Sequence, residues 1–152
     1  MKKLVSKIDG KLLHTIFYIS DVDKKRIDVI DEDNQLQFSA SEIVKGKKFR
    51  PHYHIPKKIE YTEITSQEAW VIIKGSIKAT YYDTNSKILS NEILNAGDVS
   101  ITLQGGHTFE VLEEDTILYE FKTGPYLGVK LDKNFIKDQH QDTNIDPYLQ
   151  TK

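Results

Sequence analysis

The residues of this chain with the clearest chemical meaning are two histidines separated by one residue. His52 and His54 fall in a segment that reads as a β-strand, and side chains two apart on a strand project from the same face. Two imidazoles held in this way can chelate one metal ion, and imidazole binds zinc, iron, nickel, manganese and copper. An isolated pair of this kind is more often a pair of surface histidines. The pair therefore indicates a metal site only if the rest of the chain supplies further ligands.

The elements that must position these residues are strands. Short apolar or β-branched segments recur about every 8–12 residues, separated by Gly, Asn and Asp, which is typical of a sandwich or barrel. Tight turns are predicted at 74–76, 83–86 and 95–98. The expected strands are 12–19, 26–31, 35–44, 48–54, 69–74, 76–82, 87–93, 98–103, 107–112 and 116–122.

Size and composition exclude several classes of protein. A chain of 152 residues with a net charge of -2 can bury one core and carries no field that would attract nucleic acid or an anionic membrane. It has no cysteine and no apolar run long enough for a signal peptide or a membrane span, so a cytoplasmic protein is expected. We expect one domain over 1–131 and a polar tail over 132–152 that forms a short helix, an arm or a frayed end.

The flanks of the histidine pair resemble the first sequence motif of the cupin family. That motif is a Gly, five residues, His-x-His, a short gap, Glu, six residues and Gly. Here Gly46 precedes the pair at the expected distance, and Glu68 precedes Gly75 by six residues. The departure is the gap, because 13 residues separate His54 from Glu68 where three or four are usual.

The second cupin motif is present in a degraded form. It runs from Gly97 through Gly105 to His107, which follows the course of Gly, five residues, Pro, Gly and a nearby His. Leu103 stands in place of the Pro, and Val111 stands where an Asn is usual. The resemblance covers about residues 35 to 122, with the motifs themselves in 46–111. It implies an all-β jelly-roll barrel, the double-stranded β-helix.

The resemblance also implies a ligand set for one divalent ion of iron, manganese, nickel or zinc. The ligands would be His52, His54, Glu68 and His107. Glu60 and Glu63 remain rivals of Glu68 because of the long gap, although Glu68 shares a strand face with Trp70 and Ile72. His14 and His140 have no partner pattern and are expected on the surface.

Substrate contacts are predicted from alternation along the strands. Arg50 shares a face with the histidine pair, and its guanidinium suits a phosphate or carboxylate. Glu120 and Lys122 fall on one face of the last strand, where they could act as base and acid or form an ion pair with each other. Tyr82 and Tyr126 are further candidates for the pocket.

A closer resemblance points to small bacterial cupins associated with surface polysaccharide gene clusters. The residues that carry it are Phe49 to His54, Gln67 and Glu68, Gly105 to His107, Gly124 to Tyr126, and Asp132 with Lys133. It implies an association with nucleotide-sugar or sugar-phosphate chemistry. A divalent metal that acts as a Lewis acid beside a sugar carbonyl predicts an isomerase or epimerase. The sheet edges that a jelly roll leaves uncovered predict a homodimer. An iron(II) dioxygenase and a non-catalytic carbohydrate-binding cupin are the alternatives.

Overall fold

The computed structural model describes residues 1–56 and 65–136, and the regular secondary structure of this part of the chain is almost entirely β-strand. The elements are β1 (Lys2–Val5), β2 (Leu12–Phe17), a 3-10 turn (Ile19–Asp21), β3 (Ile27–Asp28), β4 (Ser39–Ala40), β5 (Glu68–Lys74), β6 (Ser76–Tyr82), β7 (Ile88–Asn95), β8 (Val99–Thr102), β9 (Gly106–Val111), β10 (Ile117–Lys122) and α1 (Val129–Asp132). All strand pairs are antiparallel. The predicted all-β class is confirmed.

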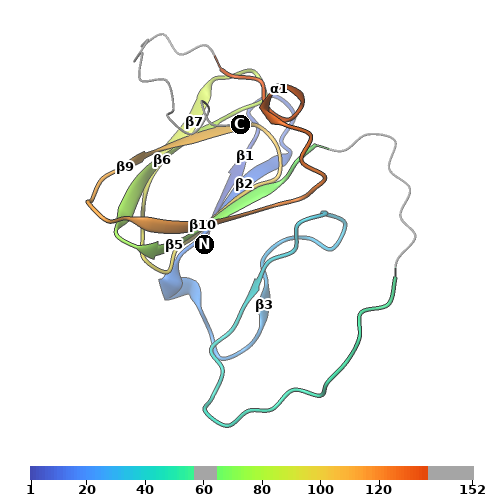
Figure 1. The fold of residues 1–152 in the computed structure, drawn as a ribbon. Coiled ribbons are helices and arrows are strands. Elements are labelled where there is room, and N and C mark those ends of the chain that lie inside the picture. Colours follow the sequence, from blue (N-terminus) through green and yellow to red (C-terminus); the bar gives the residue numbers. More distant parts are fainter. Residues whose placement is uncertain (57–64, 137–152) are drawn as a thin grey trace.

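Two sheets face each other (Figure 1). The larger has the order β1-β2-β8-β5-β10, the smaller has the order β7-β6-β9, and β3 and β4 form a separate hairpin. Among the described strands, the larger sheet ends in β1 and β10 and the smaller sheet in β7 and β9, and each of these four strands has one partner, so neither sheet closes on itself or on the other. The described residues therefore form packed sheets and do not close into a barrel.

Alternation along the strands produces two apolar clusters, one on each face of the larger sheet. Ile16, Trp70 and Ile72 point toward the smaller sheet and meet Ile77 and Tyr81 there. A second cluster on the opposite face lies beneath the β3–β4 hairpin; it comprises Phe17, Val29, Ile30, Ala69, Val99, Ile101 and Leu103. Because successive side chains point to opposite faces, one strand can contribute to both clusters.

The tight turns lie where the sequence predicts them. Gly75 joins β5 to β6 and Gly97 precedes β8, and their φ angles of 76° and 92° favour glycine. A Cβ at position 75 would lie 2.3 Å from the side-chain oxygen of Thr116, so close approach also favours glycine there. These turns set consecutive strands antiparallel.

The N-terminal third of the chain differs from its prediction. Residues 48–54 form no strand, and the strands expected over 26–31 and 35–44 are reduced to β3 and β4. The reason is that a strand needs a hydrogen-bonded neighbour, and none of the described strands pairs with 48–54. Residues 41–56 instead run away from the two sheets (Figure 1). β1 was missing from the prediction because it has only four residues, two of them lysines.

No helix in the described ranges has the length and apolar character needed to cross a membrane.

Candidate functional site

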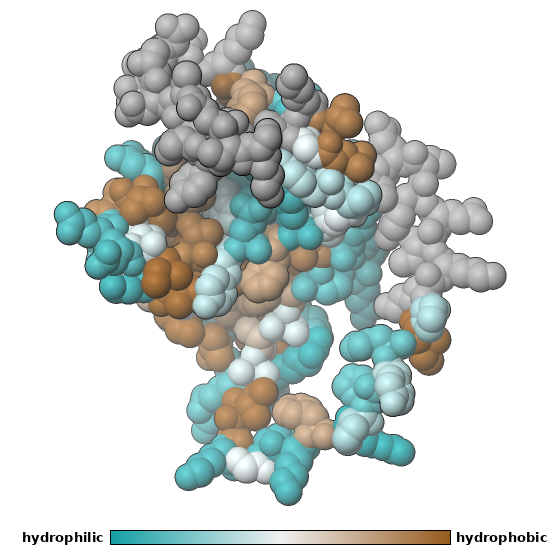
Figure 2. Space-filling view, in the orientation of Figure 1, coloured by the Kyte–Doolittle hydropathy of each residue, from teal (hydrophilic) through white to brown (hydrophobic). Residues whose placement is uncertain are grey.

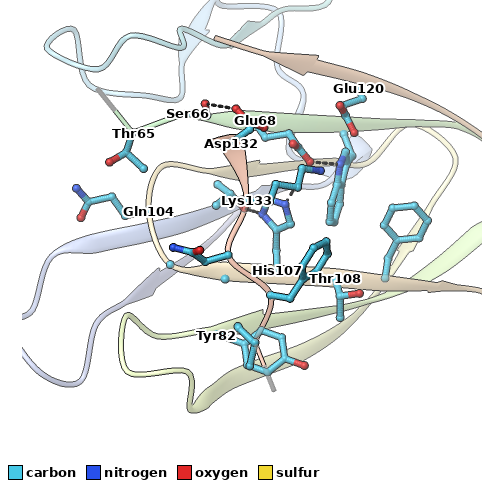
Figure 3. A pocket seen from close by; sticks show the side chains of 18 residues that line it. Thr65, Ser66, Glu68, Tyr82, Gln104, His107, Thr108, Glu120, Asp132 and Lys133 are labelled. Atoms are coloured by element: carbon cyan, nitrogen blue, oxygen red, sulfur yellow. Dashed lines mark hydrogen bonds and ion pairs between the residues drawn. The ribbon is translucent and has the colours of Figure 1, made fainter. Parts of the chain in front are cut away.

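A cavity of about 800 Å³ lies between the two sheets and the segment that follows β10 (Figure 3). Hydroxyl, amide and charged side chains line it together with apolar side chains and aromatic rings from both sheets. The lining residues are Thr65, Ser66, Glu68, Trp70, Tyr82, Thr102, Gln104, Gly105, Gly106, His107, Thr108, Phe109, Glu120, Asp132, Lys133, Asn134, Phe135 and Ile136. This mixture of apolar walls and convergent polar groups is typical of a small-molecule site.

Glu68 and His107 form the centre of the site. The Nε2 atom of His107 lies 3.2 Å from Oε1 of Glu68, and the indole Nε1 of Trp70 donates a hydrogen bond of 2.7 Å to the same oxygen. The imidazole meets the indole edge-on, with ring centroids 4.6 Å apart. Glu68 is 7% exposed, so the carboxylate is shielded from water and its orientation is fixed by these contacts.

The charge of Glu68 follows from two opposing effects. Burial raises the pKa of a carboxyl, but the hydrogen bond and charge of His107, the charge of Lys133 and the hydrogen bond from Trp70 outweigh it. The pKa of Glu68 therefore lies below its ordinary value, and the group is ionised at neutral pH. An ionised carboxylate accepts hydrogen bonds or binds a cation. His107 must therefore either donate a proton to Glu68 or share a bound cation with it.

Strand register explains how residues far apart in sequence meet here. Thr102 on β8 lies between His14 on β2 and Glu68 on β5, and Lys122 on β10 lies opposite Glu68. These four residues form one polar row across the larger sheet. His107 faces the row from β9 of the smaller sheet, and its Nδ1 atom lies 2.8 Å from the hydroxyl of Thr102.

His14 was expected on the surface, and this prediction is wrong. Its side chain is 0% exposed and hydrogen-bonds to the Thr102 hydroxyl and the Tyr82 carbonyl, both at 3.0 Å. Burial lowers the pKa of His14 to about 4, although the hydrogen bond to Tyr82 opposes the shift. Sequence reasoning missed the residue because its partners are distant in the chain. The only local signal was its place in the alternating segment of β2.

The predicted ligands are brought together only in part. His52 and His54 are exposed on the segment outside the two sheets; their ring centroids are 5.2 Å apart, and neither residue lines the cavity. Arg50 is also exposed, and its carbonyl lies 3.0 Å from Nδ1 of His52. Within 1–56 and 65–136, no three His, Cys, Asp or Glu side chains gather closely enough to hold a metal ion.

Three of the sequence candidates, Glu60, Glu63 and His140, fall outside the described residues. The identity of the carboxylate ligand therefore stays a prediction. The donor chemistry of Glu68 and His107 fits two ligands of a divalent metal, since an imidazole nitrogen and a carboxylate oxygen both bind such ions.

The predicted catalytic and substrate residues divide into two groups. Glu120 and Tyr82 line the cavity from opposite sides (Figure 3). Lys122 instead forms an ion pair of 2.9 Å with Asp132, and its Nζ atom lies 4.1 Å from the ring centroid of Tyr126. Burial lowers the pKa of Lys122, but Asp132 and other nearby carboxylates raise it above its ordinary value, so the amine stays protonated.

The segment after β10 forms a wall of the cavity that the sequence predicted only as a tail. Asp132 accepts hydrogen bonds from Lys122 and, at 3.0 Å, from the Ser66 hydroxyl. A Cβ at Gly106 would lie 2.4 Å from the Cδ1 atom of Ile136. Glycine at position 106 therefore allows this segment to pack against the start of β9.

Comparisons of the chain with protein-family models, curated proteins and solved structures found no match.

Proposed function

We propose that the protein is a metal-dependent cupin that acts on a carbohydrate or nucleotide sugar as an isomerase or epimerase. The observation that carries the proposal is the shielded Glu68–His107 pair inside a cavity lined by polar side chains. Such a pair offers one nitrogen and one oxygen donor to a divalent ion of iron, manganese, nickel or zinc. The proposed ligand set adds His52 and His54.

In this proposal the segment around His52 and His54 packs along the open edge of β9 and completes a jelly roll. Alternation puts both histidines on one side of the segment and Phe49, Tyr53 and Ile55 on the other. Those three apolar side chains are 67%, 99% and 83% exposed, so burying them is favourable. Metal binding would supply the remaining free energy, because ligation and ordering of a segment are coupled.

The lining of the cavity supports a polyhydroxylated substrate. Ser66, Thr65 and Thr108 offer hydroxyl groups, and Gln104 and Asn134 offer amides that both donate and accept. Phe109 and Trp70 lie edge to face with centroids 4.8 Å apart at the same cavity and add apolar surface. Sugars present both hydroxyl groups and apolar ring faces, so this lining suits them.

The proposed reaction needs a proton transferred next to a carbonyl group. A bound divalent ion would supply Lewis-acid stabilisation of the sugar oxygens. Glu120 is an exposed carboxylate at the cavity and is proposed as the base, with Tyr82 on the opposite side as a partner in proton transfer. Because Lys122 is paired with Asp132, we assign it the role of holding the segment after β10 at the cavity, and not that of an acid.

The proposal includes a homodimer. Figure 2 shows apolar side chains gathered on the face where β5, β9 and β10 lie in Figure 1. Exposed members on these strands are Ile73, Phe109, Val111, Ile117, Tyr119 and Phe121. Such a patch beside an open strand edge favours pairing with a second chain. Light scattering after gel filtration should give the mass of two chains, and Phe121→Lys should shift the protein toward one.

Metal content tests the ligand assignment. Plasma mass spectrometry of protein purified without chelator should approach one ion per chain. His107→Ala and His52→Ala should each lose most of the ion, whereas Glu110→Gln should keep it, because Glu110 lies on β9 but does not line the cavity. If both histidine variants keep the full metal content, the assignment is wrong.

The competing carboxylates are separated by single changes to Gln. The loss of metal should follow Glu68→Gln and not Glu60→Gln or Glu63→Gln. The reverse pattern would move the fourth ligand into the segment between His54 and Glu68.

Proton exchange tests the reaction. The loaded protein is incubated in deuterium oxide with a panel of nucleotide-linked hexoses and their keto forms, and carbon-bound deuterium is measured by NMR. An isomerase or epimerase should introduce deuterium beside the carbonyl, and Glu120→Gln should slow this at least tenfold while Glu110→Gln does not. Binding without exchange would indicate a carbohydrate-binding cupin, and oxygen consumption with bound iron would indicate the dioxygenase.

A further inference from the structure

The segment after β10 brings one lysine to the cavity. Lys133 is the only lysine or arginine among the described residues that line it, whereas Glu68 and Glu120 bring carboxylates there. Figure 3 shows Lys133 next to Asp132, on the side of the cavity where Glu68 lies. Lys133 is exposed, so its ammonium group remains in contact with water and can meet a dissolved ligand.

The residue before Lys133 fixes this segment to the larger sheet. Asp132 accepts a hydrogen bond of 3.0 Å from the Ser66 hydroxyl and forms an ion pair of 2.9 Å with Lys122. The side chains of Asp132 and Lys122 are only 7% and 19% exposed, so salt in the solvent screens this ion pair little. Because Asp132 is held at two points, the backbone at position 133 has a fixed place beside the cavity.

The other cations considered for this site are placed differently. Lys122 is already in an ion pair, and Arg50, which the sequence suggested for a phosphate or carboxylate, does not line the cavity. None of the ion pairs within 1–56 and 65–136 includes Lys133. The carboxylates in the cavity would repel an anionic ligand unless a cation met it, and Lys133 is placed to do so.

Hydrogen-bond donors lie close to this lysine. Thr65 precedes Ser66, and the Ser66 hydroxyl is bonded to the residue that precedes Lys133. Thr65 and Lys133 both line the cavity, so a hydroxyl and an ammonium group reach the same part of it, and the amide of Asn134 is the next lining group along the chain. Ammonium, hydroxyl and amide donors together suit a phosphate, which offers negative charge and several acceptor oxygens.

We propose that Lys133 is a substrate-binding residue that receives a phosphate group of the ligand. The substrate would then be a phosphorylated sugar, either a sugar phosphate or a nucleotide sugar, and not an uncharged one. This inference deepens the proposed function and rests on it for the sugar part of the ligand. The phosphate contact itself requires neither a metal ion nor a reaction.

Inorganic phosphate and pyrophosphate are the probes, because they carry the anionic group without a sugar. Each is titrated into the protein as purified, at matched metal content, and binding is followed by calorimetry and by the fluorescence of Trp70, the single tryptophan, which lines the cavity. Lys133→Gln should weaken binding about 10–100-fold, the usual loss for a hydrogen bond to a charged group. Tighter binding of pyrophosphate would favour a nucleotide sugar, and equal binding would favour a sugar phosphate.

Two further variants supply the matched comparison. Lys78→Gln removes the same charge from an exposed lysine on β6 that does not line the cavity, and it should bind both probes as the wild type does. Lys133→Arg keeps the charge and should restore binding to near the wild-type value. Added salt should weaken binding to the wild type more than to Lys133→Gln, because the variant lacks one charge contact. Unchanged affinity in Lys133→Gln, or no binding of either probe to the wild type, would overturn the proposal.

The two proposals can fail separately in these experiments. If the probes bind through Lys133 but the protein holds no metal and introduces no deuterium into sugars, the isomerase function fails and the phosphate contact stands. If metal and deuterium exchange are both found, and Lys133→Gln binds the probes as tightly as the wild type, the phosphate contact fails alone.

Discussion

The buried His14 predicts a specific loss of stability in mild acid. Its pKa is about 4 in the folded protein against an ordinary value of 6.5. Between these values the unfolded chain binds a proton that the folded chain does not, so the free energy of unfolding falls as the pH falls. The difference between the two pKa values corresponds to about 3 kcal/mol, at about 1.4 kcal/mol for each pH unit. Above about pH 7.5 the ring is neutral in both states and the effect vanishes.

The variant that isolates this effect is His14→Gln. A glutamine can still donate to the Tyr82 carbonyl and accept from Thr102, but it takes up no proton. Urea unfolding at intervals between pH 4 and pH 8, followed by the fluorescence of the single, buried Trp70, gives the free energy of unfolding for both proteins. Other titrating groups affect both curves alike and cancel in the difference.

The expected difference between the curves is constant above about pH 7.5. Below it the wild-type protein loses stability relative to the variant, with a slope that approaches about 1.4 kcal/mol per pH unit, as for one proton. Parallel curves through the whole range would show that His14 is protonated equally in both states. That result would refute the neutral charge of His14 in the folded protein.

Three further substitutions test the packing around the site. Gly105→Ala should lower the thermal midpoint by several degrees more than Gly10→Ala: both glycines have positive φ, but a Cβ at Gly105 would lie 2.5 Å from a neighbouring carbonyl oxygen, whereas one at Gly10 meets open space. Thr15→Val should leave the free energy of unfolding unchanged or raise it by up to about 1 kcal/mol, because the buried hydroxyl of Thr15 has no hydrogen-bond partner among the described residues. A clear loss of stability in urea unfolding would contradict this. Tyr81→Phe should cost about 1–2 kcal/mol through the lost 2.8 Å bond to Ser100, and a double-mutant cycle with Ser100→Ala should show coupling between the two positions.

Local patterns in the sequence predicted much of the fold. The alternation that puts Glu68, Trp70 and Ile72 on one face is confirmed, since the side-chain period of a strand is a property of the strand itself. Gly75 and Gly97 marked two turns correctly, because a positive φ favours glycine wherever it occurs. The same reasoning failed at 48–54, because alternation shows what a strand would bury and does not show which strand will pair with it.

The candidate site was predicted less completely than the fold. Glu68 and His107 were named from their spacing to glycines, and they meet in the cavity. His14 was placed on the surface and is wholly buried, because its partners lie 68 and 88 residues away in sequence. Lys122 was considered as a partner of Glu120 and pairs with Asp132 instead.

The sequence by itself determined the β-structure, the turns and the side chains that share each strand face, because these depend on neighbours along the chain. Only the tertiary structure decided which strands lie side by side and therefore which rows of residues cross the sheets. The register that aligns His14, Thr102 and Glu68 brings these three side chains together beside His107. Pairing between distant strands depends on total burial and hydrogen bonding across the molecule, and no local pattern encodes it.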